Sequence, residues 1–199
     1  MNQQHRYFIV HKPFNMVSQF VSPDDVVLLN QLDFNFPEGT HAIGRLDNNS
    51  EGLLLLTTDK RVTRLLFNSE TPHIRTYYVQ VKNIVSQERL QQLKDGVTIK
   101  IENGEDYIAK PTDVAIIPEP ILFKRESEEF QQHIPNTWLS ITLTEGKFHQ
   151  IRKMVAAIHH RCRRLIRVSI EDLLLEDLPA GKVKELSAAE FFGKLKIKV

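Results

Sequence analysis

Hydrophobic and polar positions along the chain form short runs that predict strands separated by turns. In Arg75–Lys82, Tyr77, Val79 and Val81 alternate with polar neighbours, which is typical of a half-buried strand. Leu53–Thr57 begins with four leucines and is expected to be a strand buried on both faces. Similar runs predict strands at 7–10, 16–21, 42–46, 97–101, 107–117, 138–143 and 164–170.

Apolar positions spaced by three and four predict a smaller number of short helices. The clearest is Gly146–Ile158, with an apolar stripe of Phe148, Ile151, Val155 and Ile158. Further helices are expected at 60–68 after an Asp59 cap, at 86–93, and after a capping box of Ser187 and Glu190, with a short turn or helix at 26–32. Residues 118–136 are bounded by proline at one end and are expected to form an extended loop.

These elements follow one another without a regular strand–helix–strand rhythm. That order favours an α+β fold with a mostly antiparallel mixed sheet. The length of 199 residues suits a single domain at 1–199. We expect two lobes, about 1–74 and 75–199, with their boundary near Glu70–Arg75.

Composition excludes several classes of protein. Hydrophobic residues make up 41% and charged residues 26%, which is the range of globular proteins rather than disordered ones. No apolar run is long enough to span a membrane, and the N-terminus lacks the apolar core of a signal peptide. The single cysteine, Cys162, excludes an intramolecular disulfide and a Cys-rich zinc site. We therefore expect a cytoplasmic protein with no membrane partner and no metal.

Positive charge is concentrated in one segment although the net charge is only +1. Residues 147–170 contain seven cations and no Asp or Glu: Lys147, Arg152, Lys153, Arg161, Arg163, Arg164 and Arg167. Such a segment attracts phosphate groups. The alternative is a solvated helix face with no ligand.

Asp47 lies in a turn-rich stretch between two apolar segments, which leaves three interpretations. It can accept backbone N–H bonds in an Asx turn. It can begin a calcium loop, because Asp47, Asn49 and Glu51 mimic the start of an EF-hand, but the twelfth position is Thr58 rather than the required Glu. It can also be a catalytic carboxylate.

Arg152 and Tyr77 are further candidates for chemistry. Arg152 lies at the edge of the predicted apolar stripe, so it either has a carboxylate partner or extends to water. Tyr77 and Tyr78 must point to opposite faces of their strand. Core packing is the simplest role for whichever ring points inward.

Five ordered blocks of the chain resemble the RsuA/RluB/RluE/RluF family of ribosomal RNA pseudouridine synthases. They are His11-Lys12-Pro13 with Val17-Ser18, Gly44–Asp47 continuing through Asp59, Arg75–Val79, Glu145–Met154, and Leu165–Val168 with Leu178–Gly181. Most members begin with a small RNA-binding domain of the S4 type. Here the pattern starts near residue 6, which resembles the large-subunit branch E that lacks this domain.

The resemblance implies the pseudouridine synthase catalytic fold, with two lobes, flanking helices and a central catalytic cleft. It implies isomerisation of uridine to pseudouridine without a cofactor. Asp47 would be the catalytic carboxylate, acting as a nucleophile at C1′ or through a glycal route. Arg152 would pair with Asp47, and Tyr77 would stack on the flipped uracil and move a proton.

The resemblance also implies how RNA is bound. Arg45 would lie beside the extruded nucleotide and fill the vacated stack. The remaining substrate-binding candidates are Lys147, Gln150, Lys153, Arg161, Arg163, Arg164 and Arg167. The expected partner is ribosomal RNA, in large-subunit 23S RNA or a pre-ribosomal particle, and the protein is expected to be a monomer. Two other functions stay open: an inactive RNA-binding protein of the same fold, and a hydrolase that releases the base.

Overall fold

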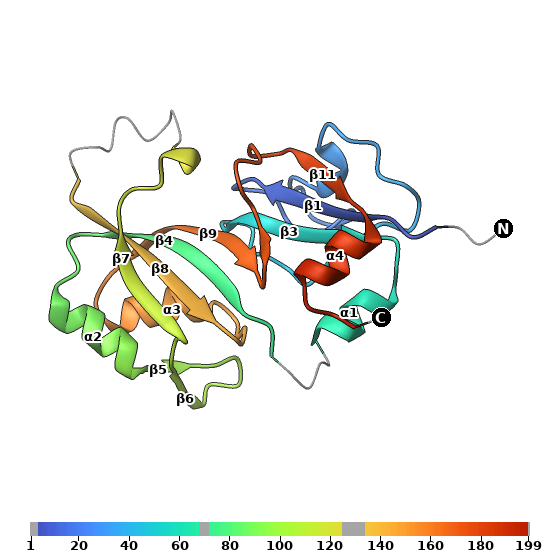
Figure 1. Cartoon of the computed structure of the whole chain (residues 1–199). Helices are drawn as coiled ribbons and strands as arrows, with labels where there is room; N and C mark the ends of the chain where they lie inside the picture. The colour runs from blue at the N-terminus through green and yellow to red at the C-terminus, as the bar shows by residue number, and fades with distance from the viewer. Residues whose placement is uncertain (1–3, 68–71, 125–133, 199) are drawn as a thin grey trace. The chain divides into compact units, whose positions relative to one another are not determined.

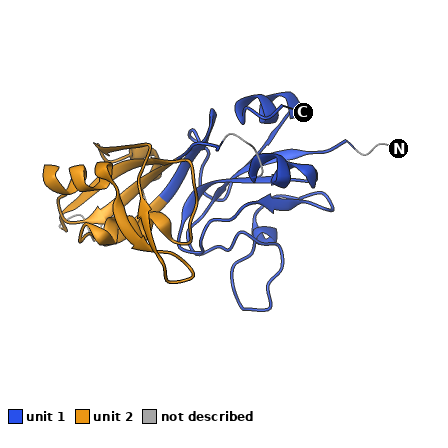
Figure 2. Ribbon diagram, turned by 90° about the horizontal axis from the view of Figure 1, so that it is seen from below, with its two compact units in different colours: residues 1–75, 166–199 blue, residues 76–165 orange. Residues whose placement is uncertain are grey.

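The computed structural model describes residues 4–67, 72–124 and 134–198. The chain folds as two compact units (Figure 2). Unit 1 comprises Met1–Arg75 and Ile166–Val199, and unit 2 comprises Thr76–Leu165. Strand β9 (Cys162–Ile170) runs from unit 2 into unit 1.

Unit 1 is built around the buried strand β3 (Glu51–Thr57), all seven residues of which are buried. It pairs antiparallel with β1 (Tyr7–Lys12) and β2 (His41–Ile43), and parallel with the second half of β9. Strand β11 (Val183–Leu186) pairs with β1, and β10 (Leu173–Leu174) pairs with β9. A strand with neighbours on both sides and apolar leucines on both faces is rigid, so β3 is a firm support for the loop that precedes it.

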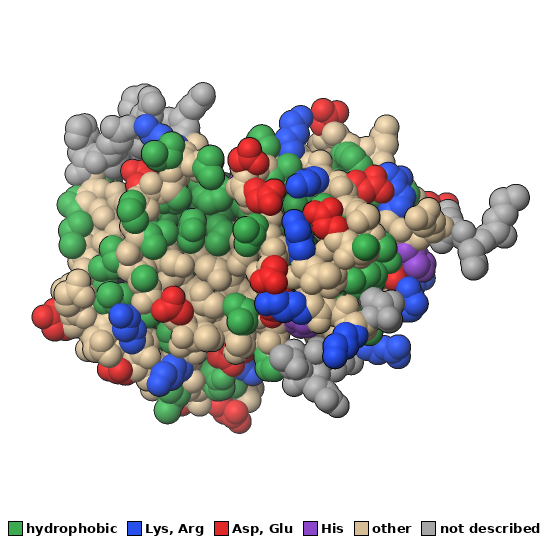
Figure 3. Space-filling view, in the orientation of Figure 1, with side chains coloured by type: hydrophobic (Ala, Val, Ile, Leu, Met, Phe, Trp, Pro, Cys, Tyr) green, Lys and Arg blue, Asp and Glu red, His purple; other side chains and the backbone are tan. Residues whose placement is uncertain are grey.

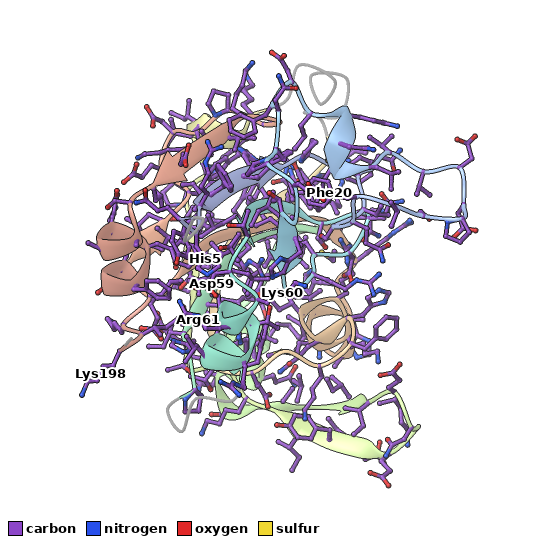
Figure 4. All side chains as sticks on the ribbon, turned by 90° about the vertical axis from the view of Figure 1, so that its right-hand side faces the viewer. His5, Phe20, Asp59, Lys60, Arg61 and Lys198 are labelled. Carbon is purple, nitrogen blue, oxygen red and sulfur yellow. The ribbon has the colours of Figure 1, made fainter. Side chains whose placement is uncertain are left out.

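Short helices complete unit 1 (Figure 1), and polar side chains cap two of them. Helix α1 (Arg61–Phe67) follows Asp59, whose Oδ1 accepts from the Arg61 backbone N–H at 3.1 Å. The Arg61 side chain bends back onto the same carboxylate, and His5 lies nearby (Figure 4). Helix α4 (Ala188–Lys194) begins after Ser187, whose Oγ accepts from Glu190 N–H. The 3₁₀ helix η1 spans Leu29–Gln31.

Unit 2 contains a second sheet segment and a second hydrophobic core. Strand β4 (Arg75–Lys82) lies between β9 and β8 (Asn136–Leu143), and β7 (Asp113–Ile117) pairs antiparallel with β8. A separate hairpin joins β5 (Val97–Lys100) and β6 (Asp106–Ala109). Helices α2 (Gln87–Asp95) and α3 (Gln150–Ala157) pack on this unit, and η2 spans Ile121–Phe123 (Figure 1).

The α+β class and the mostly antiparallel mixed sheet predicted from the sequence are confirmed. The predicted strand at 16–21 is wrong. An isolated bridge joins Met16 to Val27, and the Met16 carbonyl accepts from the Lys12 side chain. The predicted strand at 107–117 is two strands, β6 and β7, separated by a segment containing Pro111, which has no N–H to donate.

The helix predicted at 146–158 begins later in the structure than expected. A turn closed by the Gln150 N–H bond to the Lys147 carbonyl precedes the helix, and α3 begins only at Gln150 after His149, which has a left-handed backbone. Phe148 therefore lies outside the apolar stripe and is 54% exposed.

The units divide the chain differently from the expected lobes at its C-terminal end. Residues 166–199, which the sequence assigned to the second lobe, belong to unit 1 because β9 and β11 pair with β3 and β1. Among the described residues, no helix is both long and apolar enough to cross a membrane. The last part of the predicted helix 60–68, Asn68, lies outside the described residues, as does part of the predicted loop at 118–136.

Candidate catalytic loop and basic segment

Asp47 lies in a tight turn that leads directly into β3. The Ser50 backbone N–H donates to the Asp47 carbonyl at 3.0 Å, and the Ser50 hydroxyl donates to Asp47 Oδ2 at 3.4 Å. Next to it, Ser18 bonds both the N–H and the carbonyl of Leu46 at 3.0 Å. Asp47 is thus half-buried in a turn, with one serine hydroxyl on its carboxylate and another on the backbone of the residue before it.

Lys12 stabilises the same loop through its side chain. It was not among the site residues expected from the sequence. It is 0% exposed, and its ammonium donates to the carbonyls of Pro13, Met16 and Asn48 at 2.8, 2.6 and 3.4 Å. Burial lowers the pKa of Lys12 to about 8, although the carboxylates of Glu51 and Asp47 oppose this shift. The ammonium therefore links the end of β1 to the residue that follows Asp47.

Gly52 allows β3 and β9 to approach closely behind this loop. Its φ is +101°, and a Cβ at this position would lie 2.3 Å from the Arg167 carbonyl oxygen. The Arg167 side chain is buried, and its Nε donates to the Leu53 carbonyl at 2.8 Å. Glycine is required here because any side chain would collide with backbone.

Arg45 extends from the loop into solvent, whereas its neighbour Gly44 is packed. The Phe67 ring lies against Gly44, where a Cβ would approach it to 2.8 Å. The Arg75 guanidinium lies 5.6 Å from the centroid of that ring. The exposed side chain of Arg45 is compatible with the predicted contact to an extruded nucleotide, which stays a prediction.

Tyr77 and Tyr78 point to opposite faces of β4, as strand alternation requires. Tyr77 packs against the unit 2 core, and Tyr78 makes an edge contact with Phe123 at 6.2 Å between centroids. Both rings are partly exposed. Core packing accounts for part of the surface of Tyr77 and leaves part of the ring accessible.

Arg152 lies on α3 and is partly exposed. Its Nη1 donates to Cys162 Sγ at 3.6 Å. Burial raises the pKa of the Cys162 thiol to about 11, against the attraction of the Arg152 charge. The predicted pairing of Arg152 with Asp47 joins residues of the two units and stays a prediction.

Gln150 stabilises the turn before α3. It is buried, its Oε1 accepts from the Lys147 N–H at 2.8 Å, and its Nε2 donates to Glu145 at 2.6 Å. Tyr107 donates its hydroxyl to the other oxygen of Glu145. The bonds of Gln150 are therefore structural ones within unit 2.

The basic segment separates into exposed and buried members. Lys147 and Arg161 are exposed, and Lys153 and Arg163 are partly exposed. Arg164 is 4% exposed, donates to the Phe123 carbonyl at 2.6 Å and lies over the Trp138 ring. For Arg164 and Arg167, the burial and the carbonyl bonds favour a structural role over the predicted phosphate contact.

Basic and acidic side chains are otherwise interspersed on the face shown in Figure 3, in keeping with the small net charge. The structure thus brings together Asp47, Lys12 and Arg167 in unit 1. It brings together Arg152, Gln150 and the remaining basic residues on or beside α3 in unit 2. The sequence signal for Lys12 was its place in the His11-Lys12-Pro13 block of the family resemblance.

Comparisons with known proteins match this arrangement. The sequence model of a family described as RNA pseudouridylate synthase matches residues 6–157, a range that contains Asp47, Tyr77 and Arg152. The chain is 35% identical over 185 residues to a ribosomal large subunit pseudouridine synthase E of Vibrio parahaemolyticus serotype O3:K6, covering 92% of this chain and 75% of that protein.

Two further matches extend the comparison. A protein of the same name from Xanthomonas axonopodis pv. citri is 34% identical, over 85% of this chain and 88% of its own. A crystal structure of a pseudouridylate synthase superposes with a TM-score of 0.74 at 26% identity, covering 96% of this chain and 74% of that one. The fold and the sequence therefore match the same group of proteins.

Proposed function

This chain belongs to the RNA pseudouridylate synthase family, and on that premise we propose that it isomerises a uridine of ribosomal RNA to pseudouridine, with Asp47 as the catalytic carboxylate. The observation that carries the proposal is the support of the Asp47 turn by Lys12, Ser50 and Ser18. Such support fixes the position of a carboxylate, which a catalytic group requires.

The reaction exchanges one glycosidic bond for another. The bond from N1 of uracil to C1′ breaks, the base turns, and C5 bonds to C1′. C5 loses a proton and N1 gains one, so the product is an isomer and no other reactant is needed. A carboxylate that attacks C1′ would form a covalent intermediate and divide this difficult step into two. Asp47 is the residue we assign to that role, with the glycal route as the alternative.

Arg152 and Tyr77 are proposed to complete the site. Arg152, partly exposed on α3, would pair with the Asp47 carboxylate. Tyr77 has part of its ring accessible and would stack on the extruded uracil, where its hydroxyl can orient the base or move a proton. Extrusion of the base costs a few kcal/mol, which phosphate contacts from the exposed Lys147 and Arg161 and the partly exposed Lys153 would offset.

Large-subunit RNA is the proposed substrate because relatives named for that subunit match most of the chain. A relative from Escherichia coli (strain K12) named for the small subunit matches at 29% identity. Both RNAs must therefore be compared directly.

The test is product analysis with unmodified transcripts of the large- and small-subunit RNAs. The purified protein should convert uridine to its C-linked isomer in the large-subunit RNA and release no uracil. Tritium at C5 of the reacting uridine should appear in water in equal amount. Release of free uracil would indicate a hydrolase, and tight RNA binding without any product would indicate an inactive binding protein; either result contradicts the proposal.

A further inference from the structure

We propose that Phe148 and His149 form a stacking platform for an unpaired base of the RNA substrate. The inference deepens the proposed function and rests on RNA being the substrate. It adds a binding subsite that is separate from the residues assigned to the isomerisation.

The two rings form a preformed stack on the surface of unit 2. Their centroids are 3.9 Å apart and their planes differ by 17°. Phe148 is 54% exposed even with His149 and the Lys153 ammonium beside its ring, so part of the side chain is accessible to a base. Every base has a flat π-face, and stacking on exposed aromatic side chains is a general way of holding unpaired nucleotides.

One ammonium lies against this stack, and a second belongs to the residue that precedes Phe148 in the chain. The Lys153 ammonium lies 5.3 Å from the centroid of the Phe148 ring and donates to the Lys100 carbonyl at 2.6 Å, which fixes its position. Lys147, one residue before Phe148, lies 5.1 Å from the Tyr107 ring. A base on the platform would thus have ammonium groups nearby for its phosphates, the combination found in sites for single strands.

Two acidic groups of unit 2, Glu145 and Asp106, already have partners. Glu145 accepts from Tyr107 and Gln150, and Asp106 pairs with Lys100 at 2.8 Å. The basic segment itself, residues 147–170, contains no Asp or Glu. The local field therefore favours a polyanion.

A second copy of this chain is a poorer occupant of the same surface. A symmetric contact through Phe148 would bring Lys147 and Lys153 of both copies together, and like charges at close range oppose association. An RNA strand supplies both the aromatic face and the opposite charge. RNA is therefore the occupant to which the proposal commits.

The variant Phe148→Trp reports stacking through its fluorescence. The native Trp138 is only 3% exposed, so it should not stack on an added base. Phe148→Trp should lose fluorescence when titrated with an oligouridylate of about 12 nucleotides. An abasic oligonucleotide, with the same sugar–phosphate chain and no bases, should leave the fluorescence unchanged. Ile84→Trp, at a position 68% exposed in the same unit, is the matched control and should respond to neither probe. Equal responses to both probes, or none at position 148, would overturn the proposal.

Affinity provides the second readout. Phe148→Leu keeps an apolar side chain without a π-face and should weaken oligouridylate binding roughly 5- to 150-fold, whereas Phe148→Tyr should bind like the wild type. Unchanged affinity of Phe148→Leu, or wild-type self-association that Phe148→Leu abolishes, would contradict the platform. Both assays measure binding without turnover. A protein that binds bases at position 148 but makes no pseudouridine would refute the proposed function and leave this inference intact.

Discussion

The buried ammonium of Lys12 donates to the backbone carbonyl of Asn48, the residue that follows Asp47, at 3.4 Å. Lys12 ends β1, whereas Asn48 lies in the turn before β3. The same ammonium donates to Pro13 and Met16, so one side chain binds three backbone carbonyls and connects residues 13–16 to the turn before β3. Burying a charge is unfavourable in free energy unless the charge is hydrogen-bonded in this way. Here the buried charge lies at the turn that carries the proposed catalytic carboxylate.

The pKa of Lys12 leads to a prediction about stability. Because its pKa is about 8 in the folded chain and 10.5 in the unfolded one, the unfolded chain binds more protons between these values. Stability should therefore rise with pH across this window, by about 3 kcal/mol if the full shift is realised.

Urea denaturation of the wild type and of Lys12→Met between pH 7 and 10.5 measures this effect. Methionine has a similar length and no charge, so it serves as the reference without titration. The difference in unfolding free energy between wild type and variant should grow in favour of the wild type as pH rises. A difference that stays constant with pH would show that Lys12 titrates normally.

Gly52 should not tolerate even a methyl group. Gly52→Ala places Cβ 2.3 Å from a backbone oxygen of Arg167, at a φ that disfavours alanine. Gly104→Ala is the control, since Gly104 also has positive φ but has nothing within 4 Å of the added carbon. Thermal or urea unfolding should show Gly52→Ala less stable than Gly104→Ala by at least about 2 kcal/mol. Equal losses would mean that only backbone strain matters.

Helices and strands were predictable where a short stretch of sequence carries its own pattern of apolar positions or its own cap. The buried β3 follows from four consecutive leucines, and β4 from strict alternation at 75–82. The helix caps Asp59, Ser86 and Ser187 follow from their side-chain chemistry. The division into units was not predictable, because the return of residues 166–199 to unit 1 depends on the long-range pairing of β9 with β3.

The site was predictable only as far as residue types and motifs reach. The resemblance implied Asp47 and Arg152 as site residues, which stay a proposal. Burial separates Arg164 from Arg161 although the two residues are three apart. Phe148 was assigned to the core because its spacing fits a helix, and the left-handed backbone of His149 delays that helix. A single sequence carries no signal that distinguishes a solvated arginine from one bonded to a carbonyl.

Tyr77 and Tyr78 give a matched pair for testing the hydroxyl. If the Tyr77 hydroxyl orients the base or moves a proton, Tyr77→Phe should lower the single-turnover rate by about 10²–10⁴-fold. Tyr78→Phe, on the opposite face of β4, should change it little. A small loss in Tyr77→Phe would restrict its role to stacking. Loss of activity in Tyr78→Phe would instead show that the site lies on the other face of β4.

Exposed and buried arginines of the basic segment should respond differently to salt. Arg161→Gln should reduce the slope of log affinity for RNA against log salt by about one, the value for a single phosphate contact. Arg164→Gln should leave the slope unchanged and lower stability, because it removes a buried bond to the Phe123 carbonyl. The reverse pattern, measured by filter binding over a salt series, would place RNA against β9 rather than at the exposed residues.

The most direct test of the account is the single-turnover rate of Asp47→Asn on large-subunit RNA. Asparagine is close to isosteric and can still accept a hydrogen bond from Ser50, so unfolding temperature and RNA affinity should stay near those of the wild type. Formation of pseudouridine should fall by about 10⁴-fold or more, as for removal of other catalytic nucleophiles. A variant that binds RNA and forms pseudouridine at the wild-type rate would contradict the assignment of Asp47 as the catalytic carboxylate.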